Sequence, residues 1–315
     1  MSAAAATRRL ALSSAKRLIE RSLVGAGLPK LARARRRADT LVLAYHNIVP
    51  RGETAVGDLS LHLPQSAFAD QLDALLETHD IVPLTSILEE GDGSRPRLAL
   101  TFDDAYAGTV TAGIEEVARR GLPATIFVPP AFVGGGTFWW DEIADTRSGE
   151  VRPEVRAYCL WELKGRTPAI QAWAASAGIE SNALPEHQRC AEESELVRVA
   201  GVPGLTLAAH TWSHANLAAL EADELEEELV RPMAWLRERF AAPLPWVTYP
   251  YGLHSPEVER ATIAAGYRAA MRVDGGWLLG PRPTAPRSAL PRMNIPAGLS
   301  LRGFTLRTAG VKLRP

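Results

Sequence analysis

The sequence has little cysteine and no long apolar run. Its two cysteines, Cys159 and Cys190, could form one disulfide but favour free thiols in a reducing compartment. No apolar run is long enough to span a bilayer, and the N-terminus lacks the continuous apolar stretch of a secretory signal peptide. We therefore expect a cytoplasmic protein.

The sequence also lacks an excess of charge of either sign, since its net charge is −1 over 315 residues. This balance gives no reason to expect nucleic acid or an acidic substrate as a partner. Apolar residues make up 46% of the chain and charged residues 23%, which is typical of a soluble globular protein with a sizeable core. The length suits one large α/β barrel domain or two small domains.

Basic residues gather in residues 1–39. The cations there are Arg8, Arg9, Lys16, Arg17, Arg21, Lys30, Arg33, Arg35, Arg36 and Arg37, and the only acids are Glu20 and Asp39. Apolar residues recur at helical spacing, at Leu12, Ala15, Ile19 and Leu23. We expect a basic amphipathic helix that packs on the domain. The alternative is a peripheral helix, within residues 1–37, that lies on an anionic membrane surface at the inner face of the membrane.

Short apolar runs alternate with helical patterns after residue 40. The expected strands are 40–44, 97–102, 124–128, 205–209, 246–249, 267–273 and 289–295. The expected helices are one capped by Ser66, then 108–120, 223–240 and one from Ser255 to Gly266. This alternation predicts a parallel α/β sheet. Residues 132–203 break the pattern and predict a helical excursion, and residues 298–315 are expected to form a C-terminal tail.

Acidic and histidine residues follow two of these strands. Asp103 and Asp104 follow the strand at 97–102, and His210 and His214 follow the strand at 205–209. A spacing of four on one helical turn places both imidazoles on one face, as a metal requires. Two imidazoles and one carboxylate suit a divalent metal that activates water, and the second carboxylate remains as a base. We expect Zn²⁺, with Co²⁺, Ni²⁺ or Fe²⁺ as alternatives, in a hydrolase.

These motifs resemble those of the polysaccharide deacetylases, the NodB-homology carbohydrate esterases of family 4. The resemblance also rests on Tyr249-Pro250-Tyr251-Gly252 and on Tyr45-His46, and it spans residues 40–297, the expected catalytic domain. It implies a distorted, incomplete (β/α) barrel whose site lies at the strand ends. It also implies that Asp104 binds metal with the two histidines and that Asp103 is the general base. The backbone N–H of Tyr251 is then expected to stabilise the oxyanion.

The sequence departs from the family pattern at two positions. Thr248 stands where the family has an arginine that orients the base, and Leu290-Pro291-Arg292 stands where the family has a histidine general acid. We infer that Arg292 reaches into the site and holds Asp103 or the substrate. His46 is then the best remaining acid, or else it supports Asp103 structurally.

Several other residues are candidates for substrate contact. Trp139 and Trp140 follow three glycines and either stack on a sugar or belong to the core. Tyr249 and Pro250 are expected to line the substrate site. The histidines outside these motifs are expected to face solvent: His62, His79, His187 and His254.

The sequence therefore predicts a metal-dependent deacetylase that removes the N-acyl group, most simply N-acetyl, from an amino sugar in a polysaccharide or glycan precursor. Asp103 would take a proton from the attacking water, and an acid would protonate the leaving amine. An O-acetyl esterase is one alternative, because an alkoxide depends less on a strong acid. A catalytically silent, metal-containing carbohydrate-binding barrel is another, although a free base beside the metal argues against it.

Overall fold

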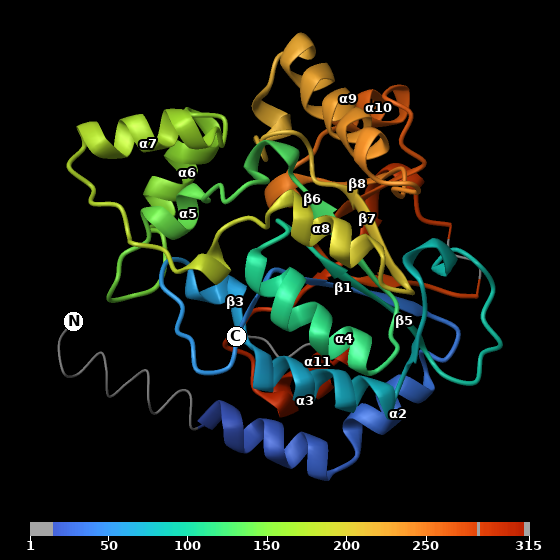
Figure 1. The fold of residues 1–315 in the computed structure, drawn as a ribbon. Helices are drawn as coiled ribbons and strands as arrows, with labels where there is room; N and C mark the ends of the chain where they lie inside the picture. The colour runs from blue at the N-terminus through green and yellow to red at the C-terminus, as the bar shows by residue number, and fades with distance from the viewer. Residues whose placement is uncertain (1–14, 282–283, 312–315) are drawn as a thin grey trace.

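The computed structural model describes residues 15–281 and 284–311 (Figure 1). Within them, ten strands form one sheet in the order β10-β1-β5-β6-β7-β8-β9-β11, with β4 beside β5 and β12 beside β1. The sheet curls into a nearly closed barrel, as the predicted fold requires. Its strands are β1 (Thr40–Tyr45), β4 (Asp80–Ile81), β5 (Arg97–Phe102), β6 (Ala124–Val128), β7 (Leu205–Ala209), β8 (Trp246–Thr248), β9 (Ala269–Arg272), β10 (Trp277–Leu278), β11 (Leu290–Pro291) and β12 (Met293–Asn294).

Residues 290–294 join the two edges of this sheet. β11 pairs in parallel with β9, and β12 pairs in parallel with β1. Between these pairs, the backbone N–H of Arg292 donates to the carbonyl of Arg272 at 2.9 Å. The single strand predicted at 289–295 is therefore two short strands, because its halves bond to opposite edges. Arg292 lies at the division.

Apolar side chains cover both faces of the sheet. On the outer face, Tyr45 and Phe102 contact Phe68 of α3 (Gln65–Leu76), with ring centroids 5.1 and 5.7 Å apart. The inner face fills the barrel with a second cluster that includes Val42, Ala99, Phe127, Ala208 and Met271. Strands buried on both faces read as continuous apolar runs. For this reason β5, β6 and β7 begin and end where the sequence predicts.

The remaining barrel helices are α4 (Ile114–Arg119), α8 (Glu193–Ala200), α9 (Ala222–Arg239) and α10 (Pro256–Ala264). α10 begins as predicted, because the side chain of Ser255 accepts a hydrogen bond from the Val258 N–H at 3.2 Å. The cap predicted for α3 is wrong. Pro64 precedes that helix and Ser66 lies inside it, since the chain enters α3 directly from strand β3 (His62–Pro64). A π-helical turn, Thr109–Gly113, precedes α4.

Three short helices form the excursion from the barrel. They are α5 (Trp139–Glu142), α6 (Pro153–Trp161) and α7 (Thr167–Ser176), which group together beside the barrel in Figure 1. The excursion is shorter than the predicted 132–203, because α8 packs against β7 and belongs to the barrel. Cys159 and Cys190 are buried and free, in agreement with the free thiols expected.

The two ends of the described chain pack together. Residues 15–25 are helical, α2 (Leu28–Ala34) follows, and α11 (Leu301–Thr308) lies against α2 and α3 (Figure 1). Glu20 is buried and accepts a hydrogen bond from Ser300 Oγ at 2.6 Å. The N-terminal helix therefore packs on the domain, and the predicted tail contains a docked helix. Arg8, Arg9 and Leu12 lie outside the described residues.

Among the helices of residues 15–281 and 284–311, none has the length and apolar character needed to cross a membrane.

Three of the histidines expected to face solvent are buried: His62, His79 and His187. Apart from Thr78, whose hydroxyl lies 2.9 Å from His79 Nδ1, their partners lie far away in the sequence, so no local pattern could indicate the burial. Asn47, on β2 (Asn47–Val49), places its side-chain nitrogen 3.1 Å from Nδ1 of His62 and 3.2 Å from Nδ1 of His187. His79 Nε2 donates to the carbonyl of Thr308 at 3.2 Å.

Candidate metal and active site

Three potential metal ligands meet where β5 and β7 end. Oδ1 of Asp104 lies 3.3 Å from Nε2 of His210 and 3.2 Å from Nε2 of His214. All three residues are buried, and one ligand atom from each lies within 4.8 Å of the others. β5 and β7 lie on either side of β6 in the parallel sheet and end at the same edge, which explains why residues about a hundred positions apart meet here.

The predicted helical turn between the two histidines is wrong. The chain from His210 to His214 is an irregular turn in which Thr211 and His214 adopt left-handed backbone angles, with φ of 59° and 57°. The Thr211 hydroxyl accepts a hydrogen bond from the His214 N–H at 3.2 Å and so stabilises this turn. The turn brings the two imidazole centroids to 4.5 Å by a different route from the one predicted.

The donor atoms of this cluster fit a divalent cation. His210 Nδ1 lies 3.0 Å from the carbonyl of Thr248, so an Nδ1–H that donates there leaves the Nε2 lone pair facing Asp104. Oδ1 of Asp104 is buried and has no hydrogen-bond partner among the described residues. A buried carboxylate oxygen that faces two imidazole nitrogens is the donor set expected around Zn²⁺ or a similar ion.

Electrostatics inside the cluster favour an ionised carboxylate. Burial raises the pKa of the Asp104 carboxyl, but the two imidazoles outweigh burial and hold this pKa well below its usual range. Burial lowers the pKa of His210, but Asp103 and Asp104 outweigh it and raise this pKa. Burial, together with His210, lowers the pKa of His214. Asp104 and His214 are thus held in the deprotonated forms that metals bind.

Asp103 lies beside the cluster and is held by a buried arginine. Nη1 and Nη2 of Arg292 donate to Oδ1 and Oδ2 of Asp103 at 2.8 and 2.7 Å, and Nη1 also donates to Thr101 Oγ1 at 3.0 Å. Burial raises the pKa of Asp103, but Arg292 and His210 outweigh burial, so the pKa is lowered. Thr248, where the family has an arginine, instead contacts His210 Nδ1 through its hydroxyl at 2.6 Å. The arginine beside Asp103 is Arg292, which lies between β11 and β12.

The cluster opens into a cleft of about 580 Å³. Of the residues predicted for the site, the cleft is lined by His46, Asp103, Asp104, Trp140, His210, His214, Tyr249 and Tyr251. Trp139, Pro250 and Arg292 lie behind these residues and do not line it. Nδ1 of His46 is buried and has no hydrogen-bond partner in the described part of the chain.

The two tryptophans have different positions. Trp140 lines the cleft, and its ring lies 4.8 Å from that of His214. Trp139 is fully buried, and its Nε1–H donates to the Tyr251 hydroxyl at 2.9 Å. Tyr251 has a φ of 59°, which a non-glycine residue adopts only when its surroundings hold it there. Trp139 therefore helps to fix Tyr251 and offers no face to a ligand.

Five further polar residues line the cleft and were not predicted from the sequence: Asp58, Ser60, Glu150, Arg156 and Asn294. Arg156 of α6 forms an ion pair with Asp58, and no sequence pattern connects these two residues. Asn294 also lines the cleft, and its Oδ1 is buried without a partner among the described residues. The place of Asn294 in the cleft could have been predicted from the sequence. Residues two apart on a strand face the same side, and Arg292, on the strand expected at 289–295, was already expected to reach the site.

Comparisons with known proteins identify the family of the chain. A family model described as polysaccharide deacetylase matches residues 90–270, more than half of the chain. The polysaccharide deacetylase BC0361 from Bacillus cereus is 15% identical, with a TM-score of 0.59 over 86% of this chain and 68% of its own. The Streptococcus pyogenes deacetylase PplD, solved with acetate, is 15% identical, with a TM-score of 0.58 over 86% of this chain and 98% of its own.

A de-N-acetylase from Aggregatibacter actinomycetemcomitans is 14% identical, with a TM-score of 0.56 over 86% of this chain and 99% of its own. At such identities these structures show a shared fold. No curated protein matches the chain. The family match together with the shared fold places the chain in the polysaccharide deacetylase family, hydrolases that act on carbon–nitrogen bonds.

Proposed function

We propose that this protein is a metal-dependent deacetylase that hydrolyses the N-acyl group of an amino sugar in a polysaccharide or glycan precursor. The observation that carries the proposal is the meeting of Asp104, His210 and His214 at one end of a cleft, with Asp103 beside them. A binding protein would have no use for a second ionised carboxylate next to the three ligands.

Asp104, His210 and His214 would hold a divalent cation, and we propose Zn²⁺, with Co²⁺, Ni²⁺ or Fe²⁺ as alternatives. When bound, such a cation supplies a Lewis acid that activates water and polarises the acyl carbonyl. Asp103 accepts the proton of the attacking water. Arg292 occupies one lone pair on each carboxylate oxygen, which leaves the others free toward the cleft. The backbone N–H of Tyr251 is proposed to donate to the oxyanion.

His46 is proposed to protonate the leaving amine. An amine leaves as an anion only with great difficulty, so amide cleavage needs a proton donor near the scissile nitrogen. His46 lines the cleft, and its buried Nδ1 has no hydrogen-bond partner in residues 15–281 and 284–311. Arg292, which stands where the family has its acid, is instead committed to Asp103. Trp140 and Tyr249 both line the cleft, and their rings are proposed to contact the sugar.

An O-acetyl esterase is the second candidate, because Leu290-Pro291-Arg292 lacks the family's acid and an ester depends less on one. The test is product analysis with metal-loaded protein on N-acetyl and O-acetyl sugars, with acetate, free amine and free hydroxyl measured separately. The proposal expects acetate with an equal amount of amine. Release of hydroxyl alone would favour the esterase, and no acetate from any substrate would contradict both. Asp103→Asn is the inactive control.

We also propose that the enzyme is cytoplasmic and contacts an anionic membrane through its N-terminal helices. In residues 15–37 the exposed cations are Lys16, Arg17, Arg21, Lys30, Arg35 and Arg37, whereas the acid, Glu20, is buried. Leu18, Ile19 and Leu31 are 66%, 53% and 54% exposed on the same segment. Exposed apolar side chains surrounded by cations are complementary to an anionic lipid surface.

A further inference from the structure

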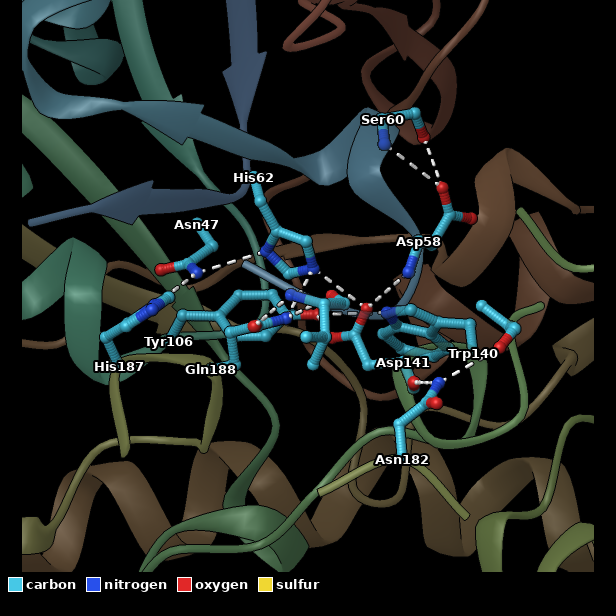
Figure 2. A network of polar contacts seen from close by, with 12 residues as sticks. Asn47, Asp58, Ser60, His62, Tyr106, Trp140, Asp141, Asn182, His187 and Gln188 are labelled. Atoms are coloured by element: carbon cyan, nitrogen blue, oxygen red, sulfur yellow. Dashed lines mark hydrogen bonds and ion pairs between the residues drawn. The ribbon is translucent and has the colours of Figure 1, made fainter. Parts of the chain in front are cut away.

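A buried polar network joins α5 to the segment that leads into β3, and Asp141 is at its centre (Figure 2). Oδ1 of Asp141 accepts hydrogen bonds from the backbone N–H of Asp58 at 3.0 Å and from His62 Nε2 at 2.9 Å. Oδ2 accepts from the Tyr106 hydroxyl at 2.8 Å. Asp141 therefore connects α5 with the loop before β3, with β3 itself and with the chain after β5.

The network reaches the proposed metal ligands by two routes. The first passes through Trp140, whose Nε1–H donates to the Tyr106 hydroxyl at 2.9 Å. With its indole nitrogen fixed there, the Trp140 ring lies 4.8 Å from that of His214. Asp141 is thus linked to the Trp140 ring, which packs on His214, through one intervening group, the Tyr106 hydroxyl.

The second route follows the backbone, since Tyr106 is two residues beyond Asp104. Asp104 and Ala105 have φ of 69° and 51°, a left-handed conformation that is unfavourable for residues other than glycine. Consecutive residues of this kind persist only where the surroundings hold them. The Ala105 carbonyl accepts a hydrogen bond from the Ala191 N–H at 2.9 Å, and the Tyr106 side chain is held by Asp141.

Stability alone gives little reason for this carboxylate. Asp141 is fully buried, and replacing a buried polar cluster by apolar residues of similar volume is often neutral or stabilising. A carboxylate is, however, suited to collecting three donors from three segments, because it accepts at both oxygens and donates nothing. Its neighbour Glu142 shows the contrast. Its carboxylate accepts from Thr137 and Gln171, and it joins α5 to α7, away from the ligands.

We propose that Asp141 is a positioning residue for the metal site. Through Tyr106 it holds the strained turn that carries Asp104, and through Tyr106 and Trp140 it holds the Trp140 ring that packs on His214. The inference rests on the proposed function in so far as Asp104 and His214 bind the cation. Residues that orient metal ligands from outside typically contribute a factor of about 10–100 to metal affinity.

The test compares Asp141→Asn and Tyr106→Phe with the matched control Glu142→Gln, which changes a buried carboxylate on the same helix. Zn²⁺ affinity is measured by competition with a chelator, and the d–d absorption of bound Co²⁺ reports the ligand geometry. We expect Asp141→Asn and Tyr106→Phe to weaken Zn²⁺ binding by about tenfold or more and to alter the Co²⁺ spectrum. Glu142→Gln should leave both unchanged.

Thermal unfolding of the metal-free proteins shows whether each variant is folded at the assay temperature. If Asp141→Asn does not fold, Tyr106→Phe, which removes one hydroxyl, decides the question alone. Wild-type affinity and spectrum in the folded variants would overturn the inference while leaving the metal site intact. An equal loss in Glu142→Gln would overturn it too, because the effect would then be general to α5. A wild-type protein that binds neither ion would overturn the proposed function together with the inference.

Discussion

Arg292 and Asp103 form a buried ion pair with two hydrogen bonds, of 2.8 and 2.7 Å, between the guanidinium and the two carboxylate oxygens. The arginine comes from the segment that joins the edges of the barrel, and the aspartate from the end of β5. The planar guanidinium matches the carboxylate in geometry and fixes its orientation. Burial raises the pKa of Asp103, but the positive charge of Arg292, together with His210, outweighs burial and lowers this pKa.

The first prediction concerns this pair and the pH profile. Because Arg292 lowers the pKa of Asp103, Arg292→Gln should raise it, so the base becomes protonated at a higher pH. The acidic limb of the kcat/KM profile should then move to higher pH. Arg292→Lys, which keeps the charge, should move it less. A removed partner can destabilise a buried pair by about 3–5 kcal/mol, so folding is checked by circular dichroism. An unmoved limb in folded Arg292→Gln would contradict the role of Arg292.

The second prediction separates the two aspartates. Asp104→Ala, His210→Ala and His214→Ala should each lose the cation, because two remaining ligands hold it weakly. Asp103→Asn should keep the cation and lose activity by about 10²–10⁴-fold, since the attacking water loses its proton acceptor. Metal content after gel filtration and the rate of acetate release are the measurements. If Asp103→Asn loses the cation instead, the two roles have been exchanged.

The third prediction concerns His46 and the leaving group. His46→Ala should slow hydrolysis of an N-acetyl sugar far more than that of an O-acetyl sugar, because an alcohol leaves more readily without protonation than an amine does. Asn294→Ala is the comparison, since it removes another unpartnered polar group from the same cleft without removing a titratable one. Equal losses on amide and ester in His46→Ala, with the cation retained, would assign His46 to structural support.

The fourth prediction concerns the basic N-terminal helices. The wild type should sediment with anionic vesicles and not with neutral ones, and added salt should weaken binding because exposed charges are screened. Replacing Lys16, Arg17 and Arg21 together by Glu should abolish sedimentation without changing hydrolysis of a soluble substrate. A control with the same change of net charge replaces three exposed arginines elsewhere: Arg147, Arg198 and Arg268. If the control loses binding equally, the contact is not specific to these helices.

Much of the barrel could be predicted because its strands are buried on both faces. β5, β6 and β7 match their apolar runs, and the strand ends then indicate where Asp103, Asp104 and His210 meet. The site could be predicted mainly from the identity of the motif residues, and their spacing contributed less to the prediction. The approach of His214 to His210 depends on two left-handed residues, which a spacing of four does not reveal.

Features that depend on distant partners could not be predicted. Tyr106 and Asp141 are ordinary polar residues in the sequence, and only the fold brings them within 2.8 Å. The histidines outside the motifs carry no local signal of burial, and for this reason His62, His79 and His187 are expected at the surface although they are buried. Their burial depends on a pairing of β2 with β3 and on the docking of α11, both of which are tertiary contacts. Long-range partners of this kind leave no periodic signal in a single sequence.

The last prediction uses one of these histidines, His79, which donates to the carbonyl of Thr308 and so joins the end of α3 to α11. Burial lowers the pKa of His79 from 6.5 to about 4. Between these values the unfolded chain binds a proton that the folded protein does not bind. The contribution of His79 to the free energy of unfolding should therefore be complete above pH 6.5. It should be lost as the pH is lowered toward 4, by roughly 3 kcal/mol in total.

His79→Gln keeps an N–H for Thr308 and removes the titrating group, so its stability should depend less steeply on pH over this range. Urea unfolding of both proteins at a series of pH values between 7 and 4.5 measures the difference. The control is His254→Gln, which changes a partly exposed histidine beside Glu259. A constant difference in unfolding free energy between wild type and His79→Gln at every pH would show that His79 is protonated equally in both states. The contact with α11 would then not exclude water from the imidazole.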